Sequence, residues 1–396
     1  MTARGASWTF ASARMLIAQT GGASRLAQHL EAAGFGHARR PLLVTDAGVA
    51  AAGLTHGALC SLRAQGMDVS VYAGTTPDPA ESLVLAAAEQ AMAHAADVII
   101  GFGGGSSMDI AKLVAVLAEP TAAQPLAEMY GVDNVRGTRL PLVQVPTTAG
   151  TGSEVTPISI ITLGADQKAG VVSSGLLPDI ALLDGELTRY LPGHVAAATG
   201  VDAMVHAIEA YTSRLRKNPL SDLLAAQALG LLSTNLAAVS REGGDDEARG
   251  AMLLGSCYAG MAFANAPVAA VHALAYPLGA QFHVPHGLSN SLMLPHVLAY
   301  NAEDEDAAQL YAEIASHVLG TEATRGAPRQ AARALVEHFT ALPGELGLPS
   351  RLSEVGVAES DILRLAEDAM KQTRLLPNNP REVGLRDAIG LYEAAM

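Results

Sequence analysis

The first half of the chain repeats a strand-then-helix pattern, and this repeat limits the possible folds more than any other feature. Short apolar runs, expected as strands over 41–46 and 97–101, are followed by longer stretches rich in Ala and Leu, such as 81–95. Further strands are expected over 67–72 and 142–145. These runs are uniformly apolar, as in strands buried on both faces. The pattern therefore predicts a parallel sheet covered by helices.

The character of the chain changes near residue 191, and from there the pattern is almost entirely helical. Long helices are expected over 221–239 and 246–263. Breaks are expected at Asn218–Pro219, Gly243–Gly244, Pro277, Pro285 and Pro343–Gly344. A chain of 396 residues is too long for one ordinary core. We predict two domains, an α/β domain over residues 1–191 and an all-helical domain over residues 192–396.

Charge and cysteine content exclude several classes of protein. Lys and Arg total 25 against 39 Asp and Glu, a formal net charge of −14, which argues against binding nucleic acid or an anionic membrane. The two cysteines, Cys60 and Cys257, are too few for a disulfide scaffold. We see neither a secretory signal nor a run of about 18 apolar residues free of charge and turn signals. The expectation is a soluble cytoplasmic protein.

The turn after the strand at 97–101 is rich in glycine. Its sequence, Gly101-Phe-Gly-Gly-Gly-Ser-Ser-Met-Asp109, leads into a helix expected over 110–117. Glycines allow the backbone to approach a ligand closely, and a helix start offers free amides at the positive end of the helix dipole. The turn therefore predicts a phosphate site. It lacks the GxGxxG fingerprint, and a tight turn without a ligand is the alternative interpretation.

A second turn of this kind follows the strand at 142–145. Its sequence, Val145-Pro-Thr-Thr-Ala-Gly-Thr-Gly-Ser-Glu-Val155, is full of hydroxyl groups and suits a ribose or pyrophosphate, or else an ordinary surface loop. Two such turns after strands of one sheet fit ligand binding at the carboxyl ends of the strands. Asp46 ends the first clear strand, where a carboxylate favours NAD over NADP. A simple cap or turn is an equal interpretation of Asp46.

The helical half contains a candidate metal centre. Asp202 and His206 are four positions apart, so on a helix they share one face. His272 lies in an apolar run, and His286 follows a proline as if it began a new helix. A buried carboxylate among imidazoles needs compensation, which a divalent cation supplies. This donor set suits Fe²⁺ or Zn²⁺ rather than Mg²⁺ or Ca²⁺. Other histidines are interpreted as core or surface residues: His194, His296 and His338.

Taken together, these motifs resemble the iron-containing (group III) alcohol dehydrogenase family. Four ordered segments that span most of the chain carry the resemblance: Gly103–Asp109, Pro146–Glu154, Gly200–His206 and His272 to Gly287. Lys168 and the segment Asn379-Pro-Arg381 also look like this family. The resemblance implies a Rossmann-like parallel-sheet domain that binds a dinucleotide and a helical-bundle domain that binds a metal, as in dehydroquinate synthase-like folds. It also implies a site in the cleft between them.

The resemblance further implies roles for individual residues. Metal ligands are implied at Asp202, His206, His272 and His286, with Fe²⁺ as the metal and Zn²⁺ as the alternative. Contacts to NAD, rather than NADP, are implied at ten positions, some of which the resemblance alone suggests: Asp46, Gly103, Gly104, Gly105, Ser106, Asp109, Thr147, Thr148, Thr151 and Lys168. Members of the family commonly form dimers or larger assemblies, so we expect a homodimer or higher homo-oligomer.

The implied activity is reversible hydride transfer between a small alcohol and NAD, with the metal as Lewis acid. The chain departs from the family at one position. Many members have a second histidine four residues after the third ligand, where this chain has Tyr276. A tyrosine hydroxyl can relay a proton but titrates far higher than imidazole, and His283 is close in sequence. Tyr276 and His283 are therefore both catalytic candidates.

Three other functions stay open at this point. One is a hydroxyacid–oxoacid transhydrogenase in which NAD stays bound between two substrates. Another is a metal- and NAD-dependent lyase of the dehydroquinate synthase type, although the motifs of the helical half show few of the basic residues that its phosphorylated substrate needs. The third is a cofactor-binding protein without catalysis. The sequence does not name the substrate.

Overall fold

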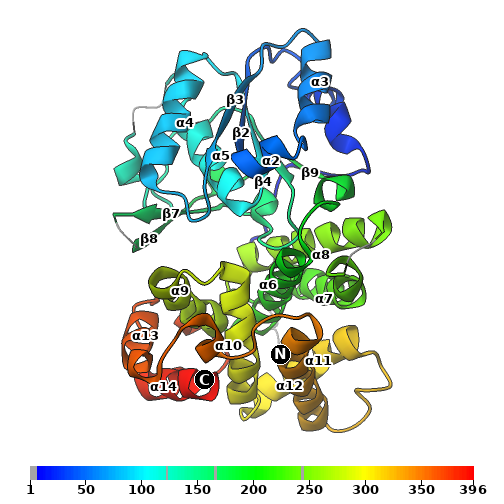
Figure 1. Cartoon of the computed structure of the whole chain (residues 1–396), viewed down its shortest axis with the longest axis vertical. Coiled ribbons are helices and arrows are strands. Elements are labelled where there is room, and N and C mark those ends of the chain that lie inside the picture. The colour runs from blue at the N-terminus through cyan, green and yellow to red at the C-terminus, as the bar shows by residue number, and fades with distance from the viewer. Residues whose placement is uncertain (1–6, 122–123, 165–166, 242–244) are drawn as a thin grey trace. The chain divides into compact units, whose positions relative to one another are not determined.

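The computed structural model divides into two compact units, and each is described by itself. It describes residues 7–121, 124–164, 167–241 and 245–396. An α/β unit spans Ala11–Tyr190, and a helical unit spans Leu191–Met396 (Figure 1). Residues 7–10 group with the helical unit, whereas the sequence-based division, which stays a prediction, put residues 1–191 together.

A six-stranded parallel sheet in the order β1-β9-β6-β4-β2-β3 forms the centre of the α/β unit. Its strands are β1 (Met15–Ala18), β2 (Pro41–Asp46), β3 (Ser70–Thr75), β4 (Val98–Gly103), β6 (Leu142–Pro146) and β9 (Ile180–Leu183). The parallel sheet expected from the repeat is confirmed. The strand expected over 67–72 begins later, because Ser70 is the residue that pairs with Leu42 of β2.

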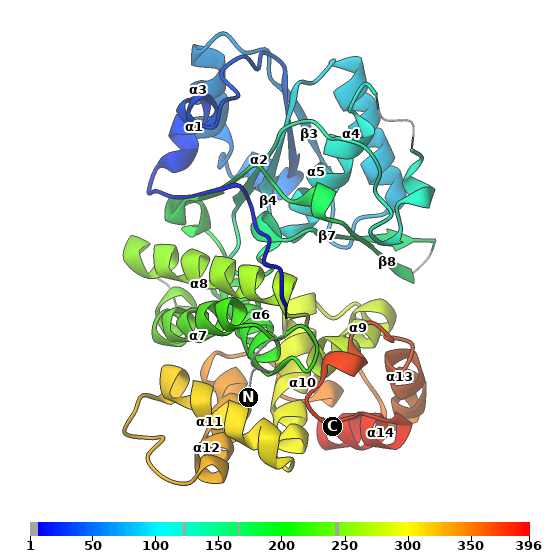
Figure 2. The same ribbon diagram turned by 180° about the vertical axis from the view of Figure 1, so that it is seen from behind.

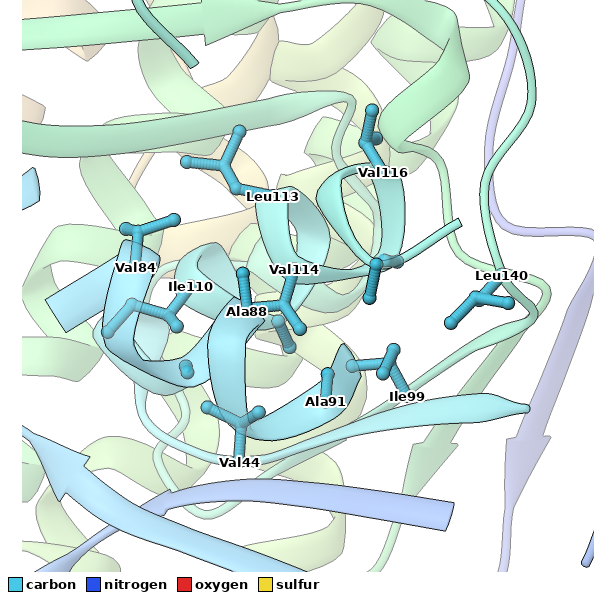
Figure 3. Close-up of a cluster of buried hydrophobic side chains, with 14 of the residues drawn as sticks. Val44, Val84, Ala88, Ala91, Ile99, Ile110, Leu113, Val114, Val116 and Leu140 are labelled. Atoms are coloured by element: carbon cyan, nitrogen blue, oxygen red, sulfur yellow. The ribbon is translucent and has the colours of Figure 1, made fainter. Parts of the chain in front are cut away.

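Helices cover both faces of this sheet, so its strands are apolar at successive positions. The helices are α1 (Leu26–Ala32), α2 (Ala47–Ala51), α3 (His56–Ala64), α4 (Glu81–Ala93) and α5 (Gly105–Leu117). Val44 and Ile99 pack with α4 and α5 in one buried cluster (Figure 3). Leu43 and Ile100, their neighbours in sequence, pack with α1 and α3 in another. The alternation of the strand places successive side chains in these two layers.

A small second sheet lies beside this core and was not predicted. It has the order β5-β8-β7, with β5 (Gly131–Val132), β7 (Ile158–Leu163) and β8 (Gln167–Val172). β7 and β8 are antiparallel, whereas β5 and β8 are parallel. β7, which follows the candidate loop after β6, also packs on α5, the helix that follows the glycine-rich turn.

The helical unit consists of nine α-helices in its described residues (Figure 2). They are α6 (Gly193–Thr212), α7 (Pro219–Val239), α8 (Asp246–Asn265), α9 (Ala270–Phe282), α10 (His286–Asn301), α11 (Glu305–Leu319), α12 (Pro328–Glu345), α13 (Ile362–Ala369) and α14 (Leu385–Ala394). α6 packs against α7, α8 and α10. Asn218 caps α7 through the amide of Ser221, with Pro219 in the first turn, as the sequence predicts for a helix start.

Several expected helix ends differ from the structure. Pro277 lies inside α9 and Pro343 inside α12, so neither is a break. A proline removes one helical hydrogen bond, and both helices continue through a proline that is buried in the packed unit. The helix expected to begin at Ile110 begins at Gly105, because Gly104 is the N-cap and residues 105–108 already form the first turn. The break expected at Gly243–Gly244 falls outside the described residues.

Helix α7 is long and apolar enough to cross a membrane by length and composition, which the sequence analysis expected of no segment. In the structure α7 packs against α6, α8 and α11. Its buried residues include Ala225, Leu229 and Leu232, and 39% of its apolar window is buried, so part of α7 packs inside this unit. Core helices pass the same test of length and composition, and the absence of membrane binding stays a prediction.

Candidate functional site

The four predicted metal ligands come together in the helical unit. Asp202 and His206 lie on α6, His272 on α9 and His286 on α10, and one ligand atom from each lies within 4.8 Å of the others. Asp202 Oδ1 is 3.9 Å from His272 Nε2 and 3.7 Å from His286 Nε2. Three of the four are buried, whereas 42% of the His286 side chain is exposed. The cluster is a buried group of acceptors with one member open to solvent.

Local sequence explains how each ligand reaches this point. The spacing of Asp202 and His206 puts both on one face of α6. Pro285 stands immediately before α10, so His286 is the first residue of that helix, as expected from the sequence. His272 sits in the first turn of α9. Two of the three helices therefore present their ligand at their start.

Sequence reasoning missed Glu209, which contacts the His272 ring at Nδ1, the nitrogen that faces away from the cluster. A carboxylate oxygen of Glu209 lies 2.6 Å from His272 Nδ1, and the same carboxylate accepts the backbone amides of Ala269 and Val271 at 2.9 and 2.7 Å. Glu209 is 3% exposed. Its bond makes Nδ1 the protonated nitrogen and leaves Nε2 of His272 as an acceptor that faces Asp202. The spacing of Glu209 from His206, one helical turn, was a usable signal.

Asn290 was also missed, although it lies one turn after His286 on α10. Its Nδ2 lies 2.5 Å from Asp202 Oδ1, 3.2 Å from His272 Nε2 and 3.3 Å from His286 Nε2. The side chain is fully buried. Its Oδ1 has no hydrogen-bond partner among the described residues. Asn290 thus touches three of the four predicted ligands.

The chemistry of this cluster fits a divalent transition-metal ion. Burial raises the pKa of Asp202, but the neighbouring His206, His286 and His272 more than offset this and hold the pKa below its usual value. The cluster therefore presents one carboxylate and three imidazoles, a set typical of Fe²⁺ and Zn²⁺ sites. The carboxylate behind His272 matches the partner that metal-bound histidines commonly have.

Aromatic rings line the cluster. The Phe263 ring, from α8, stacks on His206 with centroids 4.3 Å apart. The Tyr276 ring lies 5.9 Å from the His286 ring and 6.5 Å from the His272 ring. The structure therefore brings Tyr276 beside the predicted ligands. His283 ends α9 in a left-handed conformation with an exposed side chain, and it does not belong to the four-residue group.

In the α/β unit, the two predicted cofactor loops lie against each other. The first runs from β4 into α5 and the second follows β6, the strand that pairs with β4. The amide of Thr147 donates to the carbonyl of Gly103 over 3.0 Å. A methyl group on Gly104 would lie 3.7 Å from Thr148 Oγ1, and one on Gly105 would lie 2.9 Å from Thr151 Cγ2. The glycines allow the close approach of the two loops.

Two more glycines have a clear structural need. Gly103 has a φ of +152°, and a methyl group there would lie 2.8 Å from Ser107 Oγ. At Gly101 a methyl group would lie 2.0 Å from Gln144 Oε1 and 2.8 Å from the Ala111 side chain. Gly101 therefore lets α5 pack closely on the sheet, and Gly103 lets the chain turn into α5.

The start of α5 fits the phosphates of a dinucleotide. The helix begins at Gly105 after the N-cap Gly104, and no side-chain cap bond is found at this start among the described residues. Ser106 lies within this first turn, with its side chain partly exposed. Uncapped amides at the positive end of a helix dipole hold an anion without a basic side chain. This explains how an acidic chain can have an anion site.

Asp109 is engaged inside the protein. Its Oδ1 accepts the Ser153 hydroxyl over 2.6 Å and lies 3.3 Å from Lys112 Nζ, and its Oδ2 accepts the amide of Ile160 over 2.8 Å. These bonds tie α5 to the loop after β6 and to β7. The side chain therefore shapes the loops, and its predicted contact with a cofactor stays a prediction.

Lys112, which sequence reasoning missed, stands at the centre of this network with 0% exposure. Its Nζ donates to Ser153 Oγ over 2.6 Å, to Thr156 Oγ1 over 3.1 Å and to the carbonyl of Ile158 over 2.6 Å. Burial lowers its pKa, against the opposing effect of Asp109. Nearby Glu154 is also buried, which raises its pKa to about 7.

The remaining predicted cofactor contacts lie at strand ends and on the small sheet. Asp46 ends β2 and caps α2 by accepting the amide of Val49 over 2.9 Å. A methyl group on Gly103 would lie 3.5 Å from Asp46 Oδ2, so this carboxylate adjoins the glycine turn. Lys168, on β8, forms an ion pair with Asp78 and donates to Thr162 Oγ1 over 3.1 Å.

Comparisons with known proteins agree with this site. The model of a family described as iron-containing alcohol dehydrogenase matches residues 13–185, and that of the C-terminal part of the Fe-containing alcohol dehydrogenase family matches residues 196–396. Long-chain-alcohol dehydrogenase 1 of Geobacillus thermodenitrificans is 39% identical over 90% of both chains. Lactaldehyde reductase of Escherichia coli is 33% identical over 90% of this chain and 92% of its own.

Solved structures point the same way. A crystal structure of 1,3-propanediol oxidoreductase matches with a TM-score of 0.93 and 32% identity, covering 99% of this chain and 100% of the other. An alcohol dehydrogenase from Oenococcus oeni matches with a TM-score of 0.92 and 30% identity over 98% of this chain and 100% of its own. With these matches over nearly the full length, the chain belongs to the iron-containing alcohol dehydrogenase family and is an oxidoreductase of the alcohol dehydrogenase and aldehyde reductase type.

Proposed function

We propose that this protein interconverts small alcohols and aldehydes with NAD as redox partner and a divalent metal, Fe²⁺ or alternatively Zn²⁺, in its helical unit. The observation that carries the proposal is the convergence of Asp202, His206, His272 and His286 within 4.8 Å. The carboxylate of Glu209 behind His272 supports it, because that contact fixes which nitrogen of the ring faces the cluster.

The residues of the cluster would hold the metal. When bound, the metal supplies Lewis-acid polarisation of the substrate oxygen, and the nicotinamide supplies the redox partner of the alcohol. Asp202 offers the only anionic donor of the four and is kept ionised by its neighbours. His272 is oriented by Glu209, and His286 is the most exposed of the four. Because His286 is the exposed member, we expect a substrate oxygen to approach the cluster from its side.

Tyr276 is the residue we propose for handling the proton that an alcohol releases. Its ring lies beside His286 and His272, whereas His283 is exposed at the end of α9. The Tyr276 hydroxyl would accept the hydrogen bond of the alcohol hydroxyl and release its own hydrogen toward solvent as it takes up the proton, and His283 is the alternative candidate. Replacing Tyr276 by Phe should lower kcat at least tenfold with metal content unchanged. Full activity in Tyr276→Phe with loss in His283→Ala would assign the role to His283 alone.

The dinucleotide would bind to the α/β unit at its glycine and threonine loops. The uncapped amides at the start of α5 would hold phosphate, with Gly103, Gly104, Gly105 and Ser106 as the backbone that forms this turn. Thr147, Thr148 and Thr151 would supply hydroxyl groups from the neighbouring loop. The negative charge of Asp46 beside Gly103 supports NAD over NADP, because a 2′-phosphate would be repelled there.

The proposal is tested by replacing His272 with Ala. The variant should lose metal, measured by elemental analysis, and lose turnover by a thousandfold or more, while NAD binding stays measurable by fluorescence. Full activity in metal-free His272→Ala protein would overturn the proposal. Asn301→Ala, a change in a buried amide on α10 that bonds Asn379 and Tyr311, serves as the matched control.

The assay also separates the transhydrogenase alternative. Free NADH should appear when a short primary alcohol and NAD are the only substrates. The substrate panel should also include a long-chain alcohol and lactaldehyde, after the names of the two relatives above. Activity only when a hydroxyacid and an oxoacid are both present, with no free NADH, would favour the transhydrogenase. We further propose a cytoplasmic homodimer or larger homo-oligomer, and the low cysteine content, two cysteines in 396 residues, supports a reducing compartment. Sedimentation tests the assembly.

A further inference from the structure

The short connection between α8 and α9 determines where His272 lies in the helical unit. α8 ends at Asn265 and α9 begins at Ala270, and the two helices are bent by 105° relative to each other. His272 follows in the first turn of α9. We call residues 266–269 the α8–α9 linker. Because this linker sets the start of α9, the place of His272 depends on how the linker is held.

Residues of α6 hold the linker at two points. The carboxylate of Glu209 accepts the amide of Ala269 over 2.9 Å. The hydroxyl of Ser213, the C-cap of α6, donates to the carbonyl of Pro267 over 2.8 Å, and Ser213 is buried. The carbonyl of Val268, which lies between these two points, has its donor in another part of the chain.

Asn378 supplies this donor from 110 residues further along the chain. Its Nδ2 donates to the carbonyl of Val268 over 2.8 Å and to the carbonyl of Arg374 over 3.0 Å. These two carbonyls determine the orientation of the amide, because only its NH₂ end has hydrogens to donate. The backbone carbonyl of Asn378 accepts the amide of Arg214, just after α6, over 2.7 Å. Asn378 therefore joins the linker to the end of α6.

Apolar packing joins the same parts of the chain. Leu375 and Val268 belong to one buried cluster with Ala273 of α9. Phe263 and Tyr276 pack against this cluster, and their rings lie beside predicted metal ligands. The contact between the C-terminal part of the chain and the linker thus borders the predicted metal site.

We propose that Asn378 is a positioning residue for the metal site. By donating to the carbonyl of Val268 it fixes the linker, and through the linker it fixes the place of His272 among the four predicted ligands. Without this amide a buried carbonyl would lose its donor, which is unfavourable, so the linker would shift toward another donor and His272 would move with it. This inference rests on the metal-dependent function proposed above.

The next residue, Asn379, provides a matched control. It begins the segment Asn379-Pro-Arg381 that the sequence analysis singled out, and like Asn378 it is buried. Its side chain exchanges two hydrogen bonds with Asn301, over 2.7 and 3.1 Å. Asn301 ends α10, whereas His286 begins it, and the two are roughly 22 Å apart along the helix. Asn379 therefore bonds a part of the unit that is remote from the predicted ligands.

The experiment measures Zn²⁺ binding by the full-length wild type, Asn378→Ala and Asn379→Ala in competition with a chromophoric chelator. Asn378→Ala should bind Zn²⁺ about tenfold more weakly, the low end of the effect expected for partners of metal ligands, because it acts through the linker. Asn379→Ala should bind Zn²⁺ as tightly as the wild type, although it too removes a buried amide. The visible absorption of bound Co²⁺, which reports the arrangement of its ligands, should change only in Asn378→Ala.

A milder variant covers the case in which Asn378→Ala does not fold. Asn378→Ser keeps a hydroxyl that can donate to one of the two carbonyls, and it should lose Zn²⁺ affinity by a smaller factor. The same two measurements then decide on this variant alone.

Three results would overturn the inference. Equal weakening of Zn²⁺ binding in the variants of Asn378 and Asn379 would show that this part of the chain supports the whole unit and not His272 in particular. Unchanged Zn²⁺ affinity in the Asn378 variants would show that the linker keeps its place without the amide. An unchanged Co²⁺ spectrum would show that the ligands keep their arrangement. Failure of the wild type to bind Zn²⁺ or anaerobic Fe²⁺ would overturn the proposed function itself, which distinguishes the two failures.

Discussion

Both candidate sites have a buried charged residue behind the residues predicted to touch a ligand, but the two charges act differently. In the helical unit, the carboxylate of Glu209 orients a single predicted metal ligand, His272, through a hydrogen bond to its Nδ1. In the α/β unit, Lys112 bonds to Ser153, Thr156 and Ile158 and so fixes the shape of a loop. The predicted metal site consists of side chains, so it depends on the residues that orient each of them. The predicted cofactor site consists largely of backbone, so it depends on the buried residues that fix the conformation of its loops.

The strongest test of this difference is Lys112→Met. The change keeps much of the volume but leaves Asp109 without its buried cation and leaves the Ile158 carbonyl without a donor. Breaking a buried pair by removing one partner costs about 3–5 kcal/mol. We expect this loss in urea unfolding, together with weaker NAD binding and unchanged Zn²⁺ binding. A loss like that of the exposed control Lys371→Met would show that the loop does not depend on Lys112.

The pH dependence of stability should reveal the second buried charge in this region. Burial raises the pKa of Glu154 from 4.5 to about 7 in the folded protein. Between these values the native state binds more protons than the unfolded state, so the free energy of unfolding falls as the pH rises. The fall totals roughly 3 kcal/mol and is complete above the folded pKa. Glu154→Gln cannot titrate and should lack this fall, as measured by urea unfolding from pH 4.5 to 8.

A matched control keeps this result specific. Glu337 is exposed on α12, so Glu337→Gln should leave the pH profile of the wild type intact. If Glu154→Gln and the wild type lose stability in parallel as the pH rises, the carboxyl of Glu154 is already ionised in the folded protein at low pH. The Lys112 charge would then compensate it fully.

The sequence revealed the residues that repeat or follow a local pattern. The four predicted metal ligands, which the structure groups within 4.8 Å, stood out because their spacing and apolar surroundings are local properties. Four of the six strands of the parallel sheet followed from apolar runs, whereas β1 and β9 were not predicted. Lys112 and Asn290 were missed, since each looks like an ordinary helical residue until distant segments pack on it. Lys112 reaches Ile158 and Asn290 reaches Asp202, contacts that no local pattern contains. Tertiary packing also decided that Pro277 continues a helix.

The support of His272 gives the next largest expected effect. Glu209→Gln keeps the shape but replaces one carboxylate oxygen with an amide group, which weakens the bond to His272 Nδ1 and the acceptance of two backbone amides. Changes in such partners of metal ligands cost about 10–100-fold in metal affinity. We expect this loss of Zn²⁺ affinity in chelator competition, with NAD binding unchanged. Equal losses of Zn²⁺ and NAD affinity would mean that Glu209→Gln disturbs the whole protein. Glu209 would then not act on the metal site alone, in contrast to the effect expected of Lys112 on the cofactor site.

The smallest effect concerns the one predicted cofactor contact that the structure pairs with an exposed partner. Lys168 forms an ion pair with Asp78, whose side chain is 67% exposed, and such pairs contribute about 0–1 kcal/mol. Asp78→Asn and Lys168→Met should therefore change the free energy of unfolding by less than about 1 kcal/mol each. If Lys168 contacts the cofactor, only Lys168→Met weakens NAD binding in titration calorimetry. If Asp78→Asn weakens NAD binding to the same extent, the ion pair rather than the lysine alone shapes the site. The α/β unit would then depend on a supporting interaction at this position too, as it does at Lys112.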